Sequence, residues 1–485
     1  MTDAHIDDIH QFLKRIRSFN SSPSLQANEL LSLSKPTPET MTRYKMPLDK
    51  NNLNFFVLIG GLIKNLFLLL SIAFRTFVKS PLYLKTSKIS SRKIFISHFF
   101  GAASLTGTDK FFGIMPNIDR NDDLNFQFLY IDQIGGNLGF MNFDKGCATL
   151  SRRIYSSFHS INILVPLITK NLLMCIFLLY RLLKEANKFH RNLIGLAALS
   201  QLSVGTLRNQ IFGCQIREIA NNPFSFEIWL TLEGHAYERA IIDSLKSFNN
   251  VRIYCYQHAP VVPDQFGLFD IIEEFANKIV ICTSGRVTMN FFNEKFRNVP
   301  LELNVVGSGK YSNNSNFFNF ASDRTGVLFL AEGTDYSLKS MTSLALSVQS
   351  FLPSCRLIVR PHPNTPVESL RRNKSSLRGS NIDFSTDSLN ADFGRSFCAV
   401  YRSSASIIEA LGFGLMPIHF VDYDYQVNLD VLAISSLKYP SVRNAEELRS
   451  AVSQVLGPKI DNKFSKKSDF REFQKEYFTS LLSFS

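Results

Sequence analysis

The 485-residue sequence lacks the cysteine patterns of disulfide frameworks and of metal sites. Its seven cysteines show no CxxC pair and no short spacing, so we expect reduced, mostly buried thiols in a cytosolic protein. It also lacks a His/Cys cluster, a Gly-x-Ser-x-Gly turn, a GxGxxG loop and a Walker A loop. The polar, acidic start MTDAHIDDIHQF predicts no secretory signal. The cysteines are Cys147, Cys175, Cys214, Cys255, Cys282, Cys355 and Cys398.

Acidic residues are scarce in two segments of the chain. Residues 35–93 contain eleven Lys and Arg against two acids, and residues 151–217 contain nine against one. The surplus of these segments exceeds the net charge of +12, so the remainder is mildly acidic. The basic residues interleave with Leu, Ile and Phe and do not form a polar patch, which argues against nucleic acid as a partner.

Each basic segment holds a long apolar run, at residues 54–74 and 161–180. Lys64 and Lys170 interrupt the runs, and a lysine at the centre of a spanning helix costs about 2.5–3.5 kcal/mol. Helices that lie at a membrane interface, with basic residues on anionic lipid, fit this pattern. Buried core helices with solvated lysines, or true spanning helices, are the alternatives.

The length and the pattern of elements predict two α/β domains. A hydrophobic content of 45% excludes a disordered chain, and 485 residues exceed a single core. Strands alternate with helices from residue 226 onwards, which predicts parallel, doubly wound sheets. We expect a polar arm plus a basic apolar segment at 1–90, and a Rossmann-like domain at 91–310 with a helical insertion around 155–220. A polar linker at 310–324 precedes a second Rossmann-like domain at 325–485.

Three polar stretches follow predicted strands of the second half, at AEGT (331–334), RPHP (360–363) and YRSS (401–404). The ends of parallel strands are where open α/β sheets bind ligands. Pro361 and Pro363 end their strand and fix the orientation of His362 between them. His362 could therefore donate to a phosphate oxygen or act as a base, and the alternative is a structural loop histidine.

The other two stretches suit a phosphate and a ribose. Gly333 lets the backbone approach a ligand closely. Ser403 and Ser404 are expected to begin a helix, where N–H groups and the helix dipole favour a phosphate, although a serine there is often only an N-cap. Glu409, near the same helix end, could accept two ribose hydroxyls or be a solvated glutamate.

RPHP followed by YRSSASIIEALGFGLMPI resembles the nucleotide-sugar-binding domain of GT-B glycosyltransferases that build bacterial surface polysaccharides, above all the sialyltransferase and polysialyltransferase type. The resemblance implies a GT-B fold, with two Rossmann-like domains facing a cleft and extra N-terminal and inserted helices. It implies that His362, Pro363, Ser403 and Ser404 bind the phosphate of a CMP-sugar, with Arg360 beside them. His362 would also assist the departure of CMP.

The same group has a paired acidic motif before a glycine in its N-terminal domain, which holds the general base. LEG (232–234) is the best match and keeps one acid, Glu233. At a strand end and partly desolvated, Glu233 could take a proton from an acceptor hydroxyl, with Glu238 one turn further on. His235 and His258 are acceptor-side candidates. The alternative is that Glu233 and His235 only cap the following helix.

These features predict a cytoplasmic glycosyltransferase on the inner face of the cell membrane, building a surface polysaccharide such as capsule or lipopolysaccharide. Its partners would be a nucleotide sugar, a glycan or lipid-linked acceptor, and the anionic membrane surface. Inversion without metal or cofactor is implied, since DYD (422–424) follows the last clear strand and is interpreted as a loop. The alternatives are a CDP-glycerol or UDP-sugar transferase of the same fold, or a non-catalytic glycan-binding scaffold.

Overall fold

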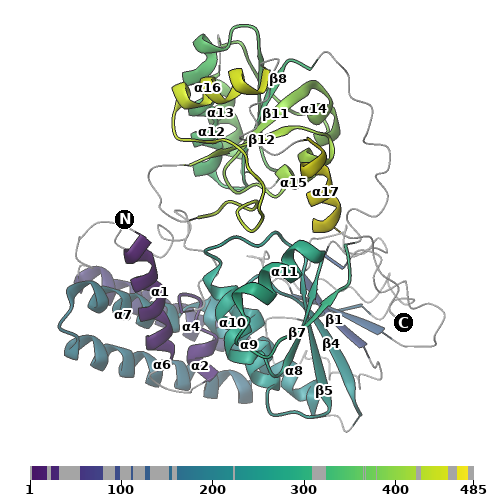
Figure 1. Cartoon of the computed structure of the whole chain (residues 1–485). Coiled ribbons are helices and arrows are strands. Elements are labelled where there is room, and N and C mark those ends of the chain that lie inside the picture. The colour runs from purple at the N-terminus through teal and green to yellow at the C-terminus, as the bar shows by residue number, and fades with distance from the viewer. Residues whose placement is uncertain are drawn as a thin grey trace.

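Two parallel sheets organise the chain (Figure 1). The computed structural model describes residues 3–18, 23–31, 55–79, 93–98, 111–112, 126–131, 152–155, 161–221, 224–308, 324–363, 365, 367–377, 380–421, 428–456 and 467–478. Within these residues the sheets have the orders β3-β2-β1-β4-β5-β6-β7 and β10-β9-β8-β11-β12-β13. Both orders are that of a Rossmann sheet, the first extended by one strand. The predicted α/β fold with two Rossmann-like domains is confirmed.

The strands of the first sheet are β1 (Lys93–His98), β2 (Phe126–Ile131), β3 (Arg152–Tyr155), β4 (Phe226–Thr231), β5 (Val251–Gln257), β6 (Ile279–Thr283) and β7 (Glu302–Val305). Those of the second are β8 (Gly326–Leu330), β9 (Arg356–Arg360), β10 (Ile382–Phe384), β11 (Ser396–Tyr401), β12 (Met416–Phe420) and β13 (Ser441–Val442).

Both faces of the first sheet are buried. Successive side chains of a strand point to opposite faces of the sheet, and here the side chains on both faces are apolar. In β4, Ile228 and Leu230 pack into one core with helices of this domain. Trp229 points to the other face, where its ring stacks on Tyr254 at a centroid distance of 4.4 Å. The helices that line the first core are α8 (Val204–Ala220), α9 (Ala236–Leu245), α10 (Phe266–Phe275) and α11 (Arg286–Lys295).

The second domain ends in a helix that returns to the first. Its helices are α12 (Asp335–Val348) with a 3-10 turn (Gln349–Phe351), α13 (Val367–Ser376), α14 (Leu389–Arg395), α15 (Ser406–Gly412), α16 (Ala445–Leu456) and α17 (Lys467–Tyr477). Helix α17 packs on α15 and also on α11. A Cβ at Gly285, just before α11, would stand 2.2 Å from the backbone oxygen of Tyr477, so only glycine allows this approach.

A helical layer flanks the first domain (Figure 1). It consists of α1 (Asp3–Ser18), α2 (Pro23–Gln26), α4 (Phe55–Lys79), α6 (Ile161–Lys184) and α7 (Lys188–Gln201), which share an apolar core with α8. The two apolar runs of the sequence are α4 and α6. Most of the predicted insertion around 155–220 is α6, α7 and α8, which lie between β3 and β4.

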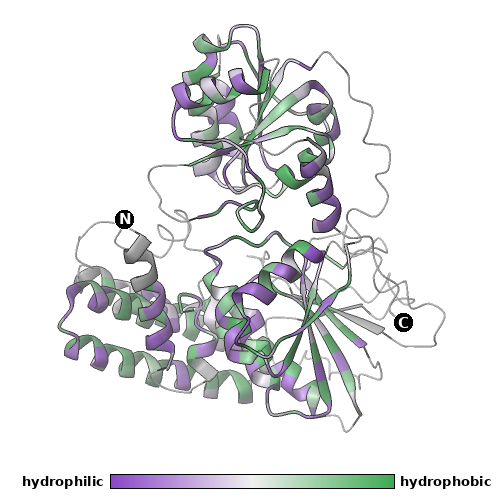
Figure 2. Cartoon of the chain, viewed as in Figure 1, coloured by the Kyte–Doolittle hydropathy of each residue, from purple (hydrophilic) through white to green (hydrophobic). Residues whose placement is uncertain are grey.

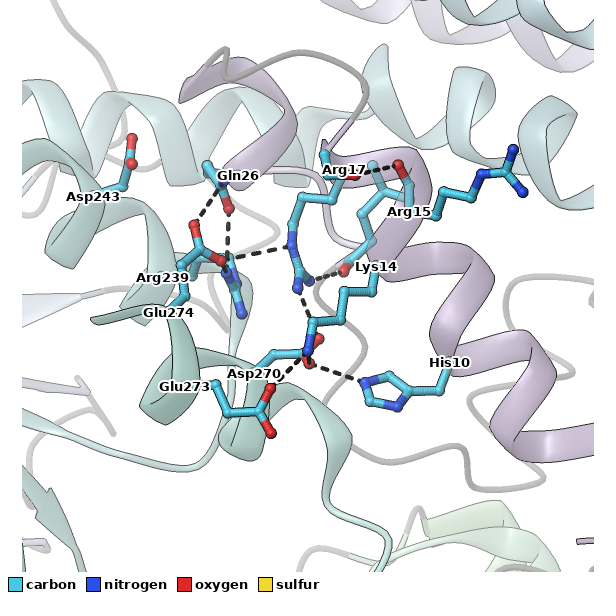
Figure 3. A network of polar contacts seen from close by, with 12 residues as sticks. His10, Lys14, Arg15, Arg17, Gln26, Arg239, Asp243, Asp270, Glu273 and Glu274 are labelled. Carbon is cyan, nitrogen blue, oxygen red and sulfur yellow. Dashed lines mark hydrogen bonds and ion pairs between the residues drawn. The ribbon is translucent and has the colours of Figure 1, made fainter. Parts of the chain in front are cut away.

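Buried charges fix helix α1 on the first domain (Figure 3). Arg17 donates to Asp270 of α10 at 2.8 Å and to the backbone oxygen of Leu31 at 2.7 Å. His10 lies 3.0 Å from the same Asp270 carboxylate. The described start of the predicted polar arm is therefore a helix that is fixed on the first domain.

Some predicted features lie outside the described residues. They include most of the linker at 310–324 and the DYD stretch at 422–424. The six described cysteines are free, and four of them are buried.

Candidate functional site

The strand order of each sheet reverses at one point, and the polar strand ends gather there. In the second sheet the reversal falls between β8 and β11. Glu332 follows β8 and Arg402 follows β11, and they form a two-bond ion pair, with Arg402 Nε donating to Glu332 Oε1 at 3.1 Å. The Ser403 N–H donates to the same oxygen at 2.9 Å. Because doubly wound sheets bind ligands at such reversals, this pair defines one wall of the candidate site.

Burial acts to raise the pKa of Glu332, but Arg402 and Ser403 outweigh it and hold the pKa below its usual value. Behind the pair, His419 Nε2 lies 3.1 Å from the backbone oxygen of Arg402, and Tyr401 donates to the buried Asp430 at 2.7 Å. Residues 401 and 402 are therefore fixed from two sides. Sequence reasoning noted both strand ends but gave neither Glu332 nor Arg402 a role, since their pairing depends on strand order.

The structure brings His362 and Gly333 together, as the convergence of strand ends predicted. A Cβ built on Gly333 would lie 3.0 Å from His362 Nδ1, so the imidazole rests against the glycine backbone. The backbone oxygen of His362 accepts from the Thr365 N–H at 3.0 Å, which closes the turn after Pro363. These contacts set the imidazole beside the loop that carries Glu332.

The paired serines precede their helix and do not begin it. Helix α15 starts at Ser406, its N-cap is Ala405, and the backbone oxygen of Ser404 accepts from Ile407. The expectation that Ser404 caps the helix is therefore wrong. The Ser403 side chain hydrogen-bonds to Glu332, whereas the Ser404 hydroxyl has no hydrogen-bond partner among the described residues and can serve a ligand. Glu409 lies in the first turn of α15, half-buried.

Arg360 has partners within the protein. Its Nη1 donates to the backbone oxygen of Asp387 at 2.8 Å and to the fully buried Asp392 carboxylate. An arginine engaged in this way fixes the connection between β10 and α14. We therefore omit Arg360 from the proposed nucleotide site.

In the first domain, Glu238 organises the loop that carries Glu233. The Glu238 carboxylate is fully buried and accepts the backbone N–H groups of Glu233, Gly234 and His235 at 2.8–3.0 Å. With no exposed surface it cannot touch a substrate, so its predicted catalytic role is corrected to a positioning one. The sequence could not separate these roles, because both require a carboxylate one turn into the helix.

The loop is rigid at Gly234. Its φ is +88°, and a Cβ there would stand 2.2 Å from the backbone nitrogen of Leu268. Gln265 donates to the backbone oxygen of Glu233 at 2.8 Å. Glu233 is thus fixed through both of its backbone polar groups.

The side chain of Glu233 lies between two histidines. Its Oε1 is 3.1 Å from His258 Nε2, and its Oε2 is 3.7 Å from His235 Nε2. Burial acts to raise the pKa of Glu233, but His258 and His235 lower it more, and the pKa lies well below its usual value. Glu233 is therefore a carboxylate, 25% exposed, in contact with two groups that can exchange protons.

His258 contacts Glu233 through only one of its two ring nitrogens, Nε2. Its ring meets Phe111 edge-on at a centroid distance of 4.5 Å. Its Nδ1 is buried and has no hydrogen-bond partner within the described chain. Buried polar atoms are nearly always paired, so an unpaired ring nitrogen next to Glu233 is unusual.

The Glu233 loop is linked to the second domain through the segment after β5. Gln265, which holds Glu233, is the N-cap of α10. Next to it, the Asp264 carboxylate accepts the Asn428 N–H of the second domain at 2.6 Å. Val262 of the same segment is fully buried in the second domain's apolar core. The loop that carries Glu233 is therefore attached to a segment on which the other domain docks.

No protein-family model and no curated protein matches the chain. Solved structures resemble it at low identity. UDP-GlcNAc 2-epimerase from Methanocaldococcus jannaschii is 11% identical over 79% of this chain and 97% of its own, with a TM-score of 0.41. OtsA is 10% identical over 80% of this chain and 96% of its own, with a TM-score of 0.43.

The pneumococcal O-GlcNAc transferase GtfA, solved with UDP and GlcNAc, is 11% identical over 56% of this chain, with a TM-score of 0.37. The chain spans only 57% of that enzyme. At these TM-scores the likeness adds nothing to the strand orders, which already define two Rossmann-like domains.

Proposed function

We propose that the protein is a GT-B glycosyltransferase that moves a sugar from a nucleotide donor to the hydroxyl of a glycan acceptor. One observation carries the proposal. The carboxylate of Glu233 lies between two histidines. Its loop is attached to a segment on which the second domain docks, and the second domain is the one that we propose binds the nucleotide. A transferase needs both parts, a base for the acceptor and a phosphate site for the leaving group.

The nucleotide sugar binds at the reversal point of the second sheet. His362 and the hydroxyls of Ser403 and Ser404 contact the phosphate, and Gly333 and Pro363 shape the backbone around it. Glu332 and Arg402 do not bind the phosphate but hold the Ser403 loop in place. Glu409 accepts the ribose hydroxyls. The likeness of the His-Pro motif to sialyltransferases supports a CMP-linked sugar.

Transfer is a direct displacement. The acceptor hydroxyl loses its proton to the Glu233–His258 pair as its oxygen bonds to the anomeric carbon, and the bond from that carbon to the phosphate oxygen breaks. The phosphate leaves with both electrons, and His362 donates a hydrogen bond to it. The lowered pKa of Glu233 makes it a weak base, so the proton is shared with the imidazole of His258, whose Nε2 lies 3.1 Å away. Direct displacement inverts the anomeric configuration and requires no metal or cofactor.

The acceptor is a glycan or lipid-linked glycan of surface polysaccharide biosynthesis, such as capsule or lipopolysaccharide. It meets the enzyme on the cytoplasmic face of the inner membrane. His235, whose side chain is 44% exposed beside Glu233, contacts this acceptor. The exposed apolar helices of the flanking layer support a peripheral location at that membrane.

The test is thermal stabilisation of the full chain by CMP, CDP, UDP and GDP at matched concentrations. A ligand at 100 times its dissociation constant adds about 2.7 kcal/mol to the free energy of unfolding, which is easily measured. We expect a selective shift with CMP that His362→Ala abolishes. Arg360→Lys is the control, because Arg360 lies on the same strand end yet contacts only the protein.

Acceptor-side variants separate an enzyme from a binding scaffold. Glu233→Gln should leave the CMP shift unchanged and lower the rate of sugar transfer to membrane-extracted acceptor by at least about a hundredfold. If no nucleotide stabilises the chain, or if Glu233→Gln and His362→Ala both leave surface polysaccharide intact in cells, the transferase proposal fails. A shift with UDP alone would keep the enzyme and replace the CMP-sugar by a UDP-sugar.

A further inference from the structure

Helices α4 and α6 present large apolar side chains to solvent. On α4, Phe67 is 72% exposed, and on α6, Leu183 is 80% exposed. In Figure 2 the ribbon of α6 is green over most of its length. We call the exposed set the α4–α6 face. It comprises Ile59, Ile63, Phe67, Leu68 and Leu70 of α4 and Val165, Leu172, Leu173, Ile176, Tyr180 and Leu183 of α6.

The spacing places most of these side chains on one side of each helix. On α4 they are Ile59, Ile63, Phe67 and Leu70, whereas Leu68 lies about 100° further round the helix than Phe67. On α6, Leu173, Ile176, Tyr180 and Leu183 follow one another at intervals of three and four residues, which is one stripe of an α-helix. The two helices pack against each other, so the two stripes belong to one layer. Soluble monomers rarely expose apolar surface in such continuous rows, and a face of this kind marks an interaction site.

The charges beside the stripes are positive. Lys64, Lys170 and Lys184 are exposed on the same helices, and Lys188 and Arg191 are exposed just after α6. Glu185 is the only acid between residues 151 and 217. Apolar side chains flanked by lysines match the acyl boundary and headgroups of an anionic bilayer. A second copy of the chain would place lysines against lysines, which is unfavourable.

The opposite faces of both helices are fixed to the protein. Asn171 of α6 is fully buried and exchanges hydrogen bonds of 2.7–2.9 Å with Gln201 and Gln210, at the end of α7 and in α8. Asn65 of α4 donates to the backbone oxygen of Leu199 in α7 at 2.9 Å. Neither helix can cross a bilayer while it is packed on α7 and α8.

Among the described residues one helix, Asn162–Lys184, is long and apolar enough to span a membrane by length and composition. Only 28% of its most apolar stretch is buried. Because one side of this helix belongs to the protein core, its composition is explained by two apolar environments, the core behind it and lipid in front of it.

We propose that the α4–α6 face lies flat in the headgroup region of an anionic bilayer, with both helix axes parallel to the surface. Phe67, Leu173 and Leu183 insert toward the acyl chains. Lys64, Lys170 and Lys184 extend their stems along the apolar surface and reach the phosphates. This surface lies on the flanking layer, outside the strand-end loops, so it goes beyond the proposed transfer reaction and does not depend on it.

The experiment is flotation of the full chain with vesicles of phosphatidylcholine, with and without an equal part of phosphatidylglycerol. We expect the chain to float with the anionic vesicles. The triple variant Phe67→Ser, Leu173→Ser, Leu183→Ser should bind at least about a thousandfold more weakly, because each buried apolar side chain contributes about tenfold or more. Replacing Lys170 and Lys184 by Gln should weaken binding about 25-fold, at about fivefold for each lysine.

The control is Phe224→Ser with Leu456→Ser, two apolar residues of similar exposure, 73% and 55%, outside the α4–α6 face. This variant should float like the wild type. The proposal is overturned if the chain binds no vesicle, or if the triple variant binds as well as the control. It is also overturned if the triple variant instead abolishes a dimer, or if wild-type chain resists extraction from vesicles by alkaline carbonate as a spanning protein does.

Discussion

The buried ion pair between Arg17 and Asp270 should contribute more to stability than any surface pair of the N-terminal helix. Both side chains are about 95% buried, and their atoms lie 2.8 Å apart (Figure 3). Removing one partner leaves a buried charge unpaired, which costs about 3–5 kcal/mol. Lys14 and Glu273 form a second pair at 2.6 Å a short distance away, but their side chains are 40% and 46% exposed. An exposed pair contributes about 0.2–1 kcal/mol.

We therefore expect Arg17→Met to lower the free energy of unfolding by about 3–5 kcal/mol, and Lys14→Met by less than about 1 kcal/mol. The double variant Arg17→Met, Asp270→Leu should recover most of the loss, because it removes both charges at once. It also removes two opposing effects on the neighbouring Arg239, whose pKa is lowered to about 10 by burial and then by Arg17, while Asp270 acts to raise it. The coupling between the two substitutions is measured by the double-mutant cycle.

The assay is urea unfolding followed by fluorescence of Trp229, the only tryptophan, which lies in the first domain. This probe reports the domain on which α1 docks and avoids mixing it with the unfolding of the second domain. If Arg17→Met and Lys14→Met destabilise the domain equally, or if the cycle shows no coupling, the Arg17–Asp270 pair in Figure 3 does not hold the helix as described.

The same pair predicts a pH dependence. Burial acts to raise the pKa of Asp270, but His10 and Arg17 lower it more, and the net pKa lies below the ordinary value of 3.8. A carboxyl group with a depressed pKa contributes its stability above the ordinary value and loses it as the pH falls toward the folded-state pKa. The difference in unfolding free energy between wild type and Asp270→Leu should therefore shrink as the pH falls below about 4.

Three further substitutions have defined outcomes. Gly234→Ala should destabilise the first domain by at least about 1 kcal/mol and abolish transfer, because the φ of residue 234 is +88° and the added Cβ would collide with Leu268. Urea unfolding and an activity assay check this. Gly333→Ala would place its Cβ 3.0 Å from His362 Nδ1, so it should displace that ring and weaken nucleotide binding, measured by thermal shift, while leaving the melting temperature nearly unchanged. Asp430→Asn should lower the stability of the second domain by about 1–3 kcal/mol in calorimetry, because Tyr401 and Tyr439 both donate to Asp430.

The sequence predicted the two sheets well, because their strands are short apolar runs separated by helices of ordinary length. Helix α17 was missed, since its pattern is mostly polar and only its packing against α11 and α15 shows its role. The ion pair that fixes α1 was also missed, because Arg17 and Asp270 are 253 residues apart in the sequence.

Within the site, proline and glycine were the informative signals. RPHP placed His362 at a strand end, and LEG placed Glu233 at another. The roles of Glu238 and Arg360 could not be read in this way, since a charged residue near a strand end serves a ligand or the protein according to its partners. For both residues the structure shows buried hydrogen bonds to other groups of the protein, so their role is structural.

Each of the two domains carries a Glu-Gly loop after a strand. The partners of each glutamate indicate whether it takes part in proton transfer or only holds the structure in place. Glu332 is bound by Arg402, which stays charged at every relevant pH and can neither take nor give a proton. Glu233 is bound by two histidines, which can. We therefore expect Glu332→Gln to weaken nucleotide binding while the pH–rate profile keeps its shape.

Glu233→Gln should instead lower kcat by at least about a hundredfold and change the acidic limb of that profile, as loss of an acid–base group does. His258→Asn should give the same change, because His258 shares the proton with Glu233 in the proposed step. His235→Asn, at 3.7 Å and more exposed, should act mainly on KM for the acceptor. If Glu332→Gln alters the profile and Glu233→Gln does not, the two glutamates have been assigned the wrong way round.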